Sequence, residues 1–224
     1  MNIIVSNKKW HRDLAEEIQA LTGQETVFIN SKELINYEYL NRIKPDYIFF
    51  THWSYIIPAS IYECFNCIVF HMTDLPFGRG GSPLQNLIVR GVEETKLSAI
   101  KCVKELDAGD IYLKKPLSLH GTAEEVFLRA TDLMRGMIIE IINEKPEPVP
   151  QEGEPYVFKR RKPQDGCICE LDDLKKVFDY IRMLDAEGYP RAFLDIGKFH
   201  FEFERASLKD GFIKADVKIS MRTD

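Results

Sequence analysis

The chain has 224 residues, a formal net charge of -5 and a hydrophobic share of 45%, enough to bury the core of one domain with an appendage or of two small domains. This charge balance lacks the basic excess of nucleic-acid-binding domains, so we do not expect nucleic acid as a partner. No apolar run approaches the ~20 residues of a membrane span. The first six residues read as a strand and not as a signal peptide, so we expect a cytoplasmic protein without a membrane partner.

Strands and helices alternate over the first seventy residues. Trp10, Leu14, Ile18 and Leu21 recur at helical spacing, and Gly23 follows as a stop signal. The expected strands cover residues 2–6, 26–30, 47–50 and 67–71, and the expected helices cover residues 8–21, 31 to about 40, and 58–62. This alternation predicts a parallel sheet with helices on both of its sides.

The middle of the chain continues the same pattern. Pro83 sits in the first turn of a helix over 83–89, and strands are expected over 97–103 and 111–113. Thr122 and Glu125 match a capping box, which predicts the start of a long amphipathic helix that runs to residue 142.

Composition changes after the long helix. Residues 143–155 contain four prolines, which is typical of a semi-rigid connection. A basic run over 159–162 precedes a helix over about 172–184, and alternating segments over 199–204 and 212–219 predict a small antiparallel unit. We therefore expect an α/β catalytic domain over 1–150 with a mostly parallel sheet, and a small α+β subdomain over 151–224.

The segment that begins at His71 has the strongest functional signal. His71 ends the apolar run from Cys67, where open α/β sheets place their ligands. Pro76 and several glycines interrupt the residues that follow, so we expect a loop and not a continued strand or helix. Asp107 lies in a second polar turn, 36 residues after His71. A histidine and an aspartate at two strand ends form a plausible proton-handling pair, although each alone is compatible with a structural role.

Cysteines and the remaining histidines give weaker signals. The odd number of cysteines, five, argues against a full disulfide framework. Cys64 and Cys67 form a C-x-x-C, but Cys67 starts an apolar strand and reads as a small buried hydrophobe, so no metal site is expected. His11, His120 and His200 have no partner pattern, which favours surface or structural roles.

These motifs together resemble the 10-formyltetrahydrofolate-dependent formyltransferases. The matching residues are His71, the turn Thr73-Asp74-Leu75-Pro76, the pair Arg79-Gly80, Pro83, and the turn Asp107-Ala108-Gly109-Asp110. The segment over 53–58 resembles the part of the family that helps to hold the pterin. The basic run over 159–162 and the residues after it resemble the tail of the sugar-modifying and tRNA-modifying members. The resemblance thus extends over nearly the whole chain, and it implies a Rossmann-like formyltransferase domain.

The resemblance also implies roles for particular residues. His71 and Asp107 are the expected catalytic pair. The co-substrate 10-formyltetrahydrofolate is expected to contact Trp53, Tyr55, Ile57, Leu75, Arg79, Gly80 and Gly109. The acceptor is expected to contact Thr73, Pro83, Lys159 and Arg160. Trp53 and Tyr55 are equally compatible with core packing, and the basic run with a solvated face.

One position departs from the family pattern. The family has an asparagine two residues before the histidine, where this chain has Val69, which has no side-chain donor. Asn66 is five residues before His71, and a strand does not easily bring it to the same point. Thr73, Asn86 and His52 are the candidate replacements.

We expect an N-formyltransferase whose acceptor is an amino sugar carried on a nucleotide, because the resemblance implies a small tail for that subgroup. A homodimer through the tail is compatible with the sequence. Two alternatives stay open, namely a catalytically impaired homologue that binds folate or a nucleotide sugar, and a formyltetrahydrofolate hydrolase.

Overall fold

The computed structural model describes residues 1–222. It divides into two compact units, each built from three segments of the chain. The first unit comprises Met1–Gly80, Lys96–Leu117 and Arg129–Val157, and the second comprises Gly81–Thr95, Ser118–Leu128 and Phe158–Asp224. The expected division between residues 150 and 151 stays a prediction.

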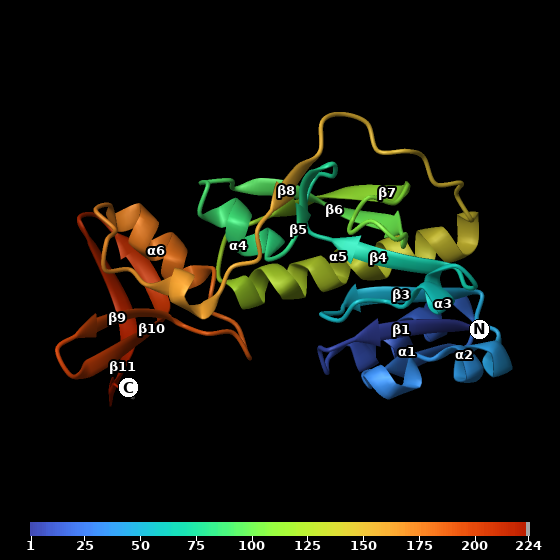
Figure 1. The fold of residues 1–224 in the computed structure, drawn as a ribbon, viewed down its shortest axis with the longest axis horizontal. Coiled ribbons are helices and arrows are strands. Elements are labelled where there is room, and N and C mark those ends of the chain that lie inside the picture. The colour runs from blue at the N-terminus through green and yellow to red at the C-terminus, as the bar shows by residue number, and fades with distance from the viewer. Residues whose placement is uncertain (223–224) are drawn as a thin grey trace. The chain divides into compact units, whose positions relative to one another are not determined.

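A six-stranded sheet dominates the first unit, in the order β2-β1-β3-β4-β6-β7 (Figure 1). Its strands are β1 (Asn2–Ser6), β2 (Thr26–Ile29), β3 (Tyr47–His52), β4 (Cys67–His71), β6 (Glu94–Lys101) and β7 (Ile111–Ser118). The first four pair in parallel, and β6 runs antiparallel to β4. Ile3, Ile4 and Val5 of β1 are fully buried, as in a strand covered on both faces. The expected α/β class with a mostly parallel sheet is confirmed.

Most helices match the sequence pattern. They are α1 (His11–Thr22), η1 (Lys32–Leu34), α2 (Tyr37–Ile43), α3 (Ala59–Tyr62), α4 (Pro83–Ile88), α5 (Ala123–Glu144), η2 (Pro163–Gly166) and α6 (Leu174–Arg182). The capping box before α5 is confirmed, because Thr122 and Glu125 exchange hydrogen bonds between side chain and backbone. The prediction of a single helix from residue 31 to about 40 was wrong. The side chain of Asn36 accepts the backbone N–H of Tyr39 and starts α2 as a separate helix after η1.

Strand lengths are the other correction. The residues after His71 include a short strand, β5 (Phe77–Gly80), which pairs with β8 (Tyr156–Phe158). The prediction of an unbroken loop after His71 was therefore wrong. The backbone N–H of Tyr156 donates to the carbonyl of Pro76 at 3.2 Å. β6 begins before the expected residue 97, and β7 continues past residue 113 to Ser118. The partner of β5 comes from a distant part of the chain, so local pattern does not reveal this strand, whereas β6 and β7 are consecutive strands that are neighbours in the sheet.

The second unit contains the expected antiparallel sheet, in the order β11-β10-β9. Its strands are β9 (Ala192–Ile196), β10 (Phe199–Lys209) and β11 (Phe212–Met221). Arg182 of α6 pairs with Asp179 at 2.6 Å and donates to the carbonyl of Leu119 at 2.6 Å. These contacts fix α6 to the segment that precedes α5. Within the described residues, no helix combines the length and the apolar character needed to cross a membrane.

Candidate active site at the end of β4

His71 occupies the carboxyl end of β4, and only 7% of its side chain is exposed. Its Nε2 atom lies 2.7 Å from the carbonyl oxygen of Gly78. A carbonyl oxygen only accepts hydrogen bonds, so Nε2 carries a hydrogen and donates it. The opposite nitrogen, Nδ1, then faces Oδ2 of Asp107 at 3.6 Å. The structure therefore brings together the two residues that the sequence singles out as a catalytic pair.

Asp107 is held in an unusual backbone conformation. Its φ angle of 54° lies in the left-handed region, which aspartate tolerates better than most residues. Its Oδ2 atom accepts the backbone N–H of Gly80 at 2.9 Å, at the end of β5. One carboxylate oxygen thus faces both the His71 imidazole and the β5 backbone.

Gly109 shapes the same turn. A Cβ atom at this position would lie 1.8 Å from the carbonyl oxygen of Lys101, at the end of β6. The backbone N–H of Lys101 also donates to the carbonyl of Asp110 at 2.8 Å. Only glycine fits this close approach, so the turn of residues 107–110 is folded tightly onto the end of β6.

Gln151 belongs to this cluster, and the sequence gives no signal for it. Its amide nitrogen Nε2 donates to the carbonyls of Asp107 (2.9 Å) and Gly109 (2.8 Å). Its Oε1 atom accepts from Arg79 Nε at 3.1 Å and from Arg79 Nη2 at 2.7 Å. Gln151 lies in the proline-rich connection, where neither periodicity nor a motif distinguishes one polar residue from another.

Lysines hold the turn that follows His71. Lys114 Nζ donates to Asp74 Oδ1 at 2.5 Å and to the carbonyl of Leu75 at 2.5 Å, and Lys96 Nζ lies 3.0 Å from Asp74 Oδ2. Burial raises the pKa of Asp74, but the hydrogen bonds and charges of Lys114 and Lys96 outweigh burial and lower it overall. The adjoining Leu75–Pro76 peptide bond is cis. Leu75, an expected cofactor contact, is 1% exposed and belongs to the core.

The segment after β3 carries a partly exposed aromatic group. The rings of Trp53 and Tyr55 meet edge to face with centroids 5.0 Å apart, and Lys32 Nζ lies 5.1 Å from the centre of the Tyr55 ring. Tyr55 is 50% exposed, Ile56 is 91% exposed, and Ile57 is half-buried. The expected pterin contacts therefore form an apolar loop at the carboxyl end of a central strand.

The expected acceptor contacts Pro83, Lys159 and Arg160 lie in the second unit. Asn86 of α4 donates through Nδ2 to the carbonyls of Gly81 (3.0 Å) and Lys159 (2.9 Å). A Cβ atom on Gly81 would lie 2.6 Å from the Cβ of Arg160, so the two backbones are in close contact. The basic run is thus anchored beside the start of α4 through its backbone, and the side chains of Lys159 and Arg160 are exposed.

Three candidate residues, and also Asn66, can be examined as replacements for the asparagine that the family has at the position of Val69. Val69 shares the face of β4 with His71, since side chains two apart on a strand point the same way. Asn66 donates to the carbonyl of Asp46 at 3.0 Å, and the amide of Asn86 binds backbone carbonyls. Thr73 is fully buried, and within residues 1–222 its hydroxyl has only a long contact of 3.4 Å, to the carbonyl of Gly78.

His52, the third candidate, belongs to a separate histidine cluster with His11, Thr51 and Thr131. His11 Nδ1 lies 2.7 Å from Thr51 Oγ1, and its Nε2 lies 2.9 Å from Thr131 Oγ1. Burial, followed by the charge of Lys8, lowers the pKa of His11 to about 4. Burial, followed by the charges of His11 and Lys8, lowers the pKa of His52 to about 3. Both rings are neutral at pH 7, and His11 is fully buried, so a surface role is wrong for it and a structural role stays a prediction.

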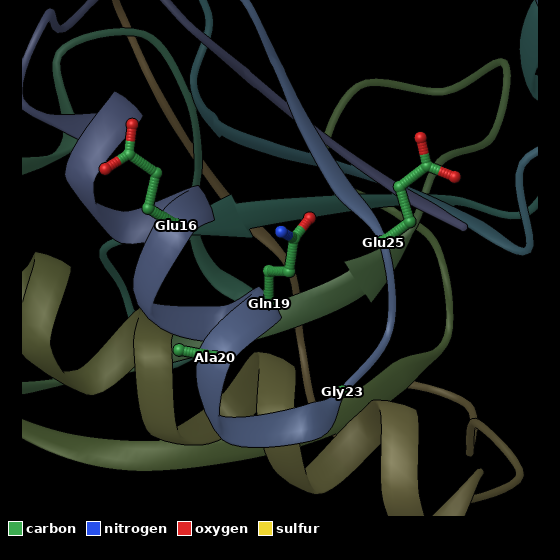
Figure 2. Close-up of a pocket in the computed structure, with 5 residues that line it drawn as sticks. All are labelled: Glu16, Gln19, Ala20, Gly23 and Glu25. Atoms are coloured by element: carbon green, nitrogen blue, oxygen red, sulfur yellow. The ribbon is translucent and has the colours of Figure 1, made fainter.

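A surface pocket lies elsewhere in the first unit, as Figure 2 shows. It is lined by Glu16, Gln19 and Ala20 of α1, by Gly23, and by Glu25 just before β2. This is the amino end of the parallel strands, whereas His71 lies at a carboxyl end. The pocket contains none of the expected site residues.

Known formyltransferases are similar to this chain in sequence and in fold. Residues 163–220 match the family model described as methionyl-tRNA formyltransferase, C-terminal domain. A solved structure, methionyl-tRNA formyltransferase from Clostridium thermocellum, is 51% identical, with a TM-score of 0.95 over 99% of this chain and 100% of that chain. A sugar N-formyltransferase from Shewanella sp FDAARGOS_354 shares the fold, with a TM-score of 0.68 at 15% identity over 100% of this chain and 98% of that one.

Among curated relatives, the methionyl-tRNA formyltransferase of Thermotoga maritima is 30% identical over 175 residues, which cover 74% of this chain and 55% of the relative. The chain thus spans about half the length of the curated relatives that it matches. The 51% identity to the Clostridium thermocellum protein, over 99% of this chain and 100% of that chain, shows that this chain belongs to the formyltransferase family.

Proposed function

We propose that the chain transfers a formyl group from 10-formyltetrahydrofolate to a primary amine, with His71 and Asp107 as the catalytic residues. The 3.6 Å approach of these two side chains at the end of β4, in a member of the formyltransferase family, is the observation that carries the proposal. A ligand at this place follows the general rule for open α/β sheets.

The chemistry assigns a task to each residue. The amine nitrogen attacks the formyl carbon and negative charge develops on the formyl oxygen. The bond to the folate nitrogen then breaks, and that nitrogen takes up the proton that the amine released, so that tetrahydrofolate leaves as the neutral amine. Each preorganised donor aimed at that oxygen is worth about 3–4 kcal/mol. In this proposal His71 turns its Nε2–H from the Gly78 carbonyl to the formyl oxygen, and Asp107 accepts the proton that the amine loses, directly or through a water.

Thr73 is the proposed replacement for the family's asparagine. Among the described residues, its hydroxyl has only the 3.4 Å contact to Gly78, whereas the Asn66 and Asn86 amides already donate to backbone carbonyls. Val69 leaves the face of β4 beside His71 without a side-chain donor. The hydroxyl of Thr73 supplies the second hydrogen bond in this proposal.

The formyl donor is proposed to bind along the carboxyl ends of β3 and β4. The exposed ring of Tyr55 and the partly buried side chains of Trp53 and Ile57 suit a flat pterin ring. Leu75, Arg79, Gly80 and Gly109 complete the proposed contacts. Leu75 does so through the backbone of its turn, because its side chain is buried.

The proposed acceptor is an amino sugar carried on a nucleotide, bound with the help of Thr73, Pro83, Lys159 and Arg160. Residues 158–224 carry 14 lysines and arginines against 13 aspartates and glutamates. This near balance suits a small anionic ligand held by a few cations better than a polyanionic tRNA, whose binding depends on many basic contacts. The name of the 51% identical Clostridium thermocellum protein favours methionyl-tRNA as the second candidate acceptor.

Parallel assays with the two acceptor classes test the proposal. The purified chain is incubated with 10-formyltetrahydrofolate and either a panel of nucleotide-linked amino sugars or methionyl-tRNA. Release of tetrahydrofolate and the mass of the product are followed together. We expect a formylated sugar nucleotide. If only methionyl-tRNA is formylated, the proposed acceptor is wrong, but the proposed formyl transfer is correct. No turnover with any amine, for protein of verified folding, would contradict the proposal.

The two alternatives predict different products. A formyltetrahydrofolate hydrolase releases formate without any amine. An impaired homologue, which Val69 motivates, binds the donor or the sugar nucleotide without turnover. Equilibrium binding and formate measurements in the same samples separate these outcomes.

A homodimer through the second unit is part of the proposal, as is a cytoplasmic location. Ile196, Phe199 and Met221 are paired across the three strands β9, β10 and β11, and they are 56%, 49% and 60% exposed. Such an apolar row on one face of a sheet suits contact with a second copy. Light scattering after size exclusion measures the mass, and Phe199→Glu is expected to convert a dimer to a monomer.

A further inference from the structure

Four hydrogen bonds converge on the side chain of Gln151. The guanidinium of Arg79 only donates, so it must face the amide oxygen Oε1. The carbonyls of Asp107 and Gly109 only accept, so they must face the amide nitrogen Nε2. These partners leave a single orientation for the amide, and in that orientation each of the four donors meets an acceptor.

The turn of residues 107–110 needs such support. Asp107 has a positive φ, and Gly109 lies against the backbone of Lys101. The side chain of Gln151 binds the main chain of this turn on both sides of Ala108, at the carbonyls of Asp107 and Gly109. A shift of the turn would move the Asp107 carboxylate away from His71 Nδ1 and from the Gly80 amide. Displacements of about 1 Å at a catalytic group cost on the order of 100-fold in rate.

We propose that Gln151 is the positioning residue of the active site, and that Arg79 orients it. The inference rests on the proposed formyl transfer for its consequence in catalysis. Gln151 is not expected to touch the reacting atoms. Its amide fixes the main chain of Asp107, and through it the distance between the carboxylate and the His71 imidazole.

Gln151→Glu is the most informative variant. Glutamate keeps the size of the side chain and an oxygen for Arg79, but it cannot donate to the two carbonyls. Gln151→Ala removes both sets of contacts. Gln164→Glu is the matched control, because it makes the same chemical change at an exposed residue of η2.

Two measurements test the proposal. In steady-state kinetics, kcat of Gln151→Glu is expected to fall about 10- to 100-fold with an unchanged KM for the formyl donor. Without any substrate, exchange of the Gly80 amide proton reports on its bond to Asp107. It is expected to become faster in Gln151→Glu, while amides of β1 and β3 exchange as in the parent chain. Gln164→Glu is expected to change neither quantity.

The outcomes separate the two proposals. A merely structural role for Gln151 predicts a lower melting temperature with an unchanged kcat and a protected Gly80 amide, and that result would overturn the inference. If the parent chain has no turnover, formyl transfer fails as the function. The Gly80 amide then still decides whether Gln151 positions Asp107.

Discussion

Two histidine clusters lie in the first unit, and their surroundings differ. His71 follows a parallel strand and faces a carboxylate across 3.6 Å, with a carbonyl on its other nitrogen. His11 faces two threonine hydroxyls, beside the ring of His52 at a centroid distance of 5.4 Å. A carboxylate beside an imidazole offers an acceptor for a transferred proton, whereas burial keeps the His11 ring neutral. The partners of each histidine, and not the residue type alone, therefore make His71 the candidate for catalysis.

The largest expected effect separates the two clusters by activity. His71→Gln keeps a donor for the Gly78 carbonyl and removes the imidazole, and we expect kcat to fall about 1000-fold. His11→Gln makes the same chemical change in the other cluster and is expected to keep kcat while it lowers the melting temperature. Kinetics and thermal unfolding of the two variants are measured side by side. Equal losses of kcat would abolish the distinction.

Acid should destabilise the fold through the His11 cluster. The pKa of His11 is lowered to about 4 in the folded chain, so protonation favours the unfolded state, in which the pKa is 6.5. The contribution of His11 is complete above pH 6.5 and is lost as the pH falls from 6.5 towards 4. Between pH 7.5 and pH 5 it amounts to about 2 kcal/mol.

Urea unfolding at both pH values measures this loss, with His11→Gln as the reference because every other titrating group is retained. The variant should lose less free energy of unfolding between the two pH values than the parent chain does. Parallel losses would show that His11 is protonated equally in both states.

Val69 tests how complete the His71 site is. Val69→Asn places an amide on the strand face that His71 occupies. Because Thr73 is the proposed second donor, we expect kcat to fall about 10-fold, whereas a rise of about 10-fold would show that the parent site lacks this donor. Val69→Leu is the control, because it changes shape without adding a donor. A fall in kcat for Val69→Asn would show that Thr73 or another group already fills this role and that the amide obstructs it.

The smallest effect concerns a single hydroxyl. Thr51→Val removes the oxygen that lies 2.7 Å from His11 Nδ1 and leaves the shape of the side chain nearly unchanged. We expect a loss of about 1 kcal/mol in the free energy of unfolding, with kcat unchanged. Chemical denaturation measures the first quantity, and a change in kcat would connect the His11 cluster to the reaction.

The sequence pattern predicted the helices that are specified by neighbouring residues, through apolar spacing and capping. The apolar spacing from Trp10 to Leu21 and the capping box at Thr122 each gave a helix that the structure contains. The start of α2 was missed, because Asn36 interrupts a segment whose composition favours one helix. The strand over Phe77–Gly80 was missed because its partner, β8, lies far along the chain and glycines mask its pattern.

The candidate site also contains residues that the sequence indicates and one residue that it does not. His71 and Asp107 were predictable, since each follows a recognisable strand and matches a family motif. Gln151 was not, because its partners Asp107 and Gly109 are 44 and 42 residues away in sequence. A single polar residue among prolines has no periodicity to mark it, and only the folded chain shows where its amide points.

The position of Gln151 also has a consequence for the order of synthesis. A ribosome releases Asp107 and its turn well before Gln151, which follows 44 residues later. During that interval the nascent chain contains both proposed catalytic side chains without the amide that holds the turn. The candidate active site is therefore completed late, when all of α5 and the first part of the connection after it have already emerged.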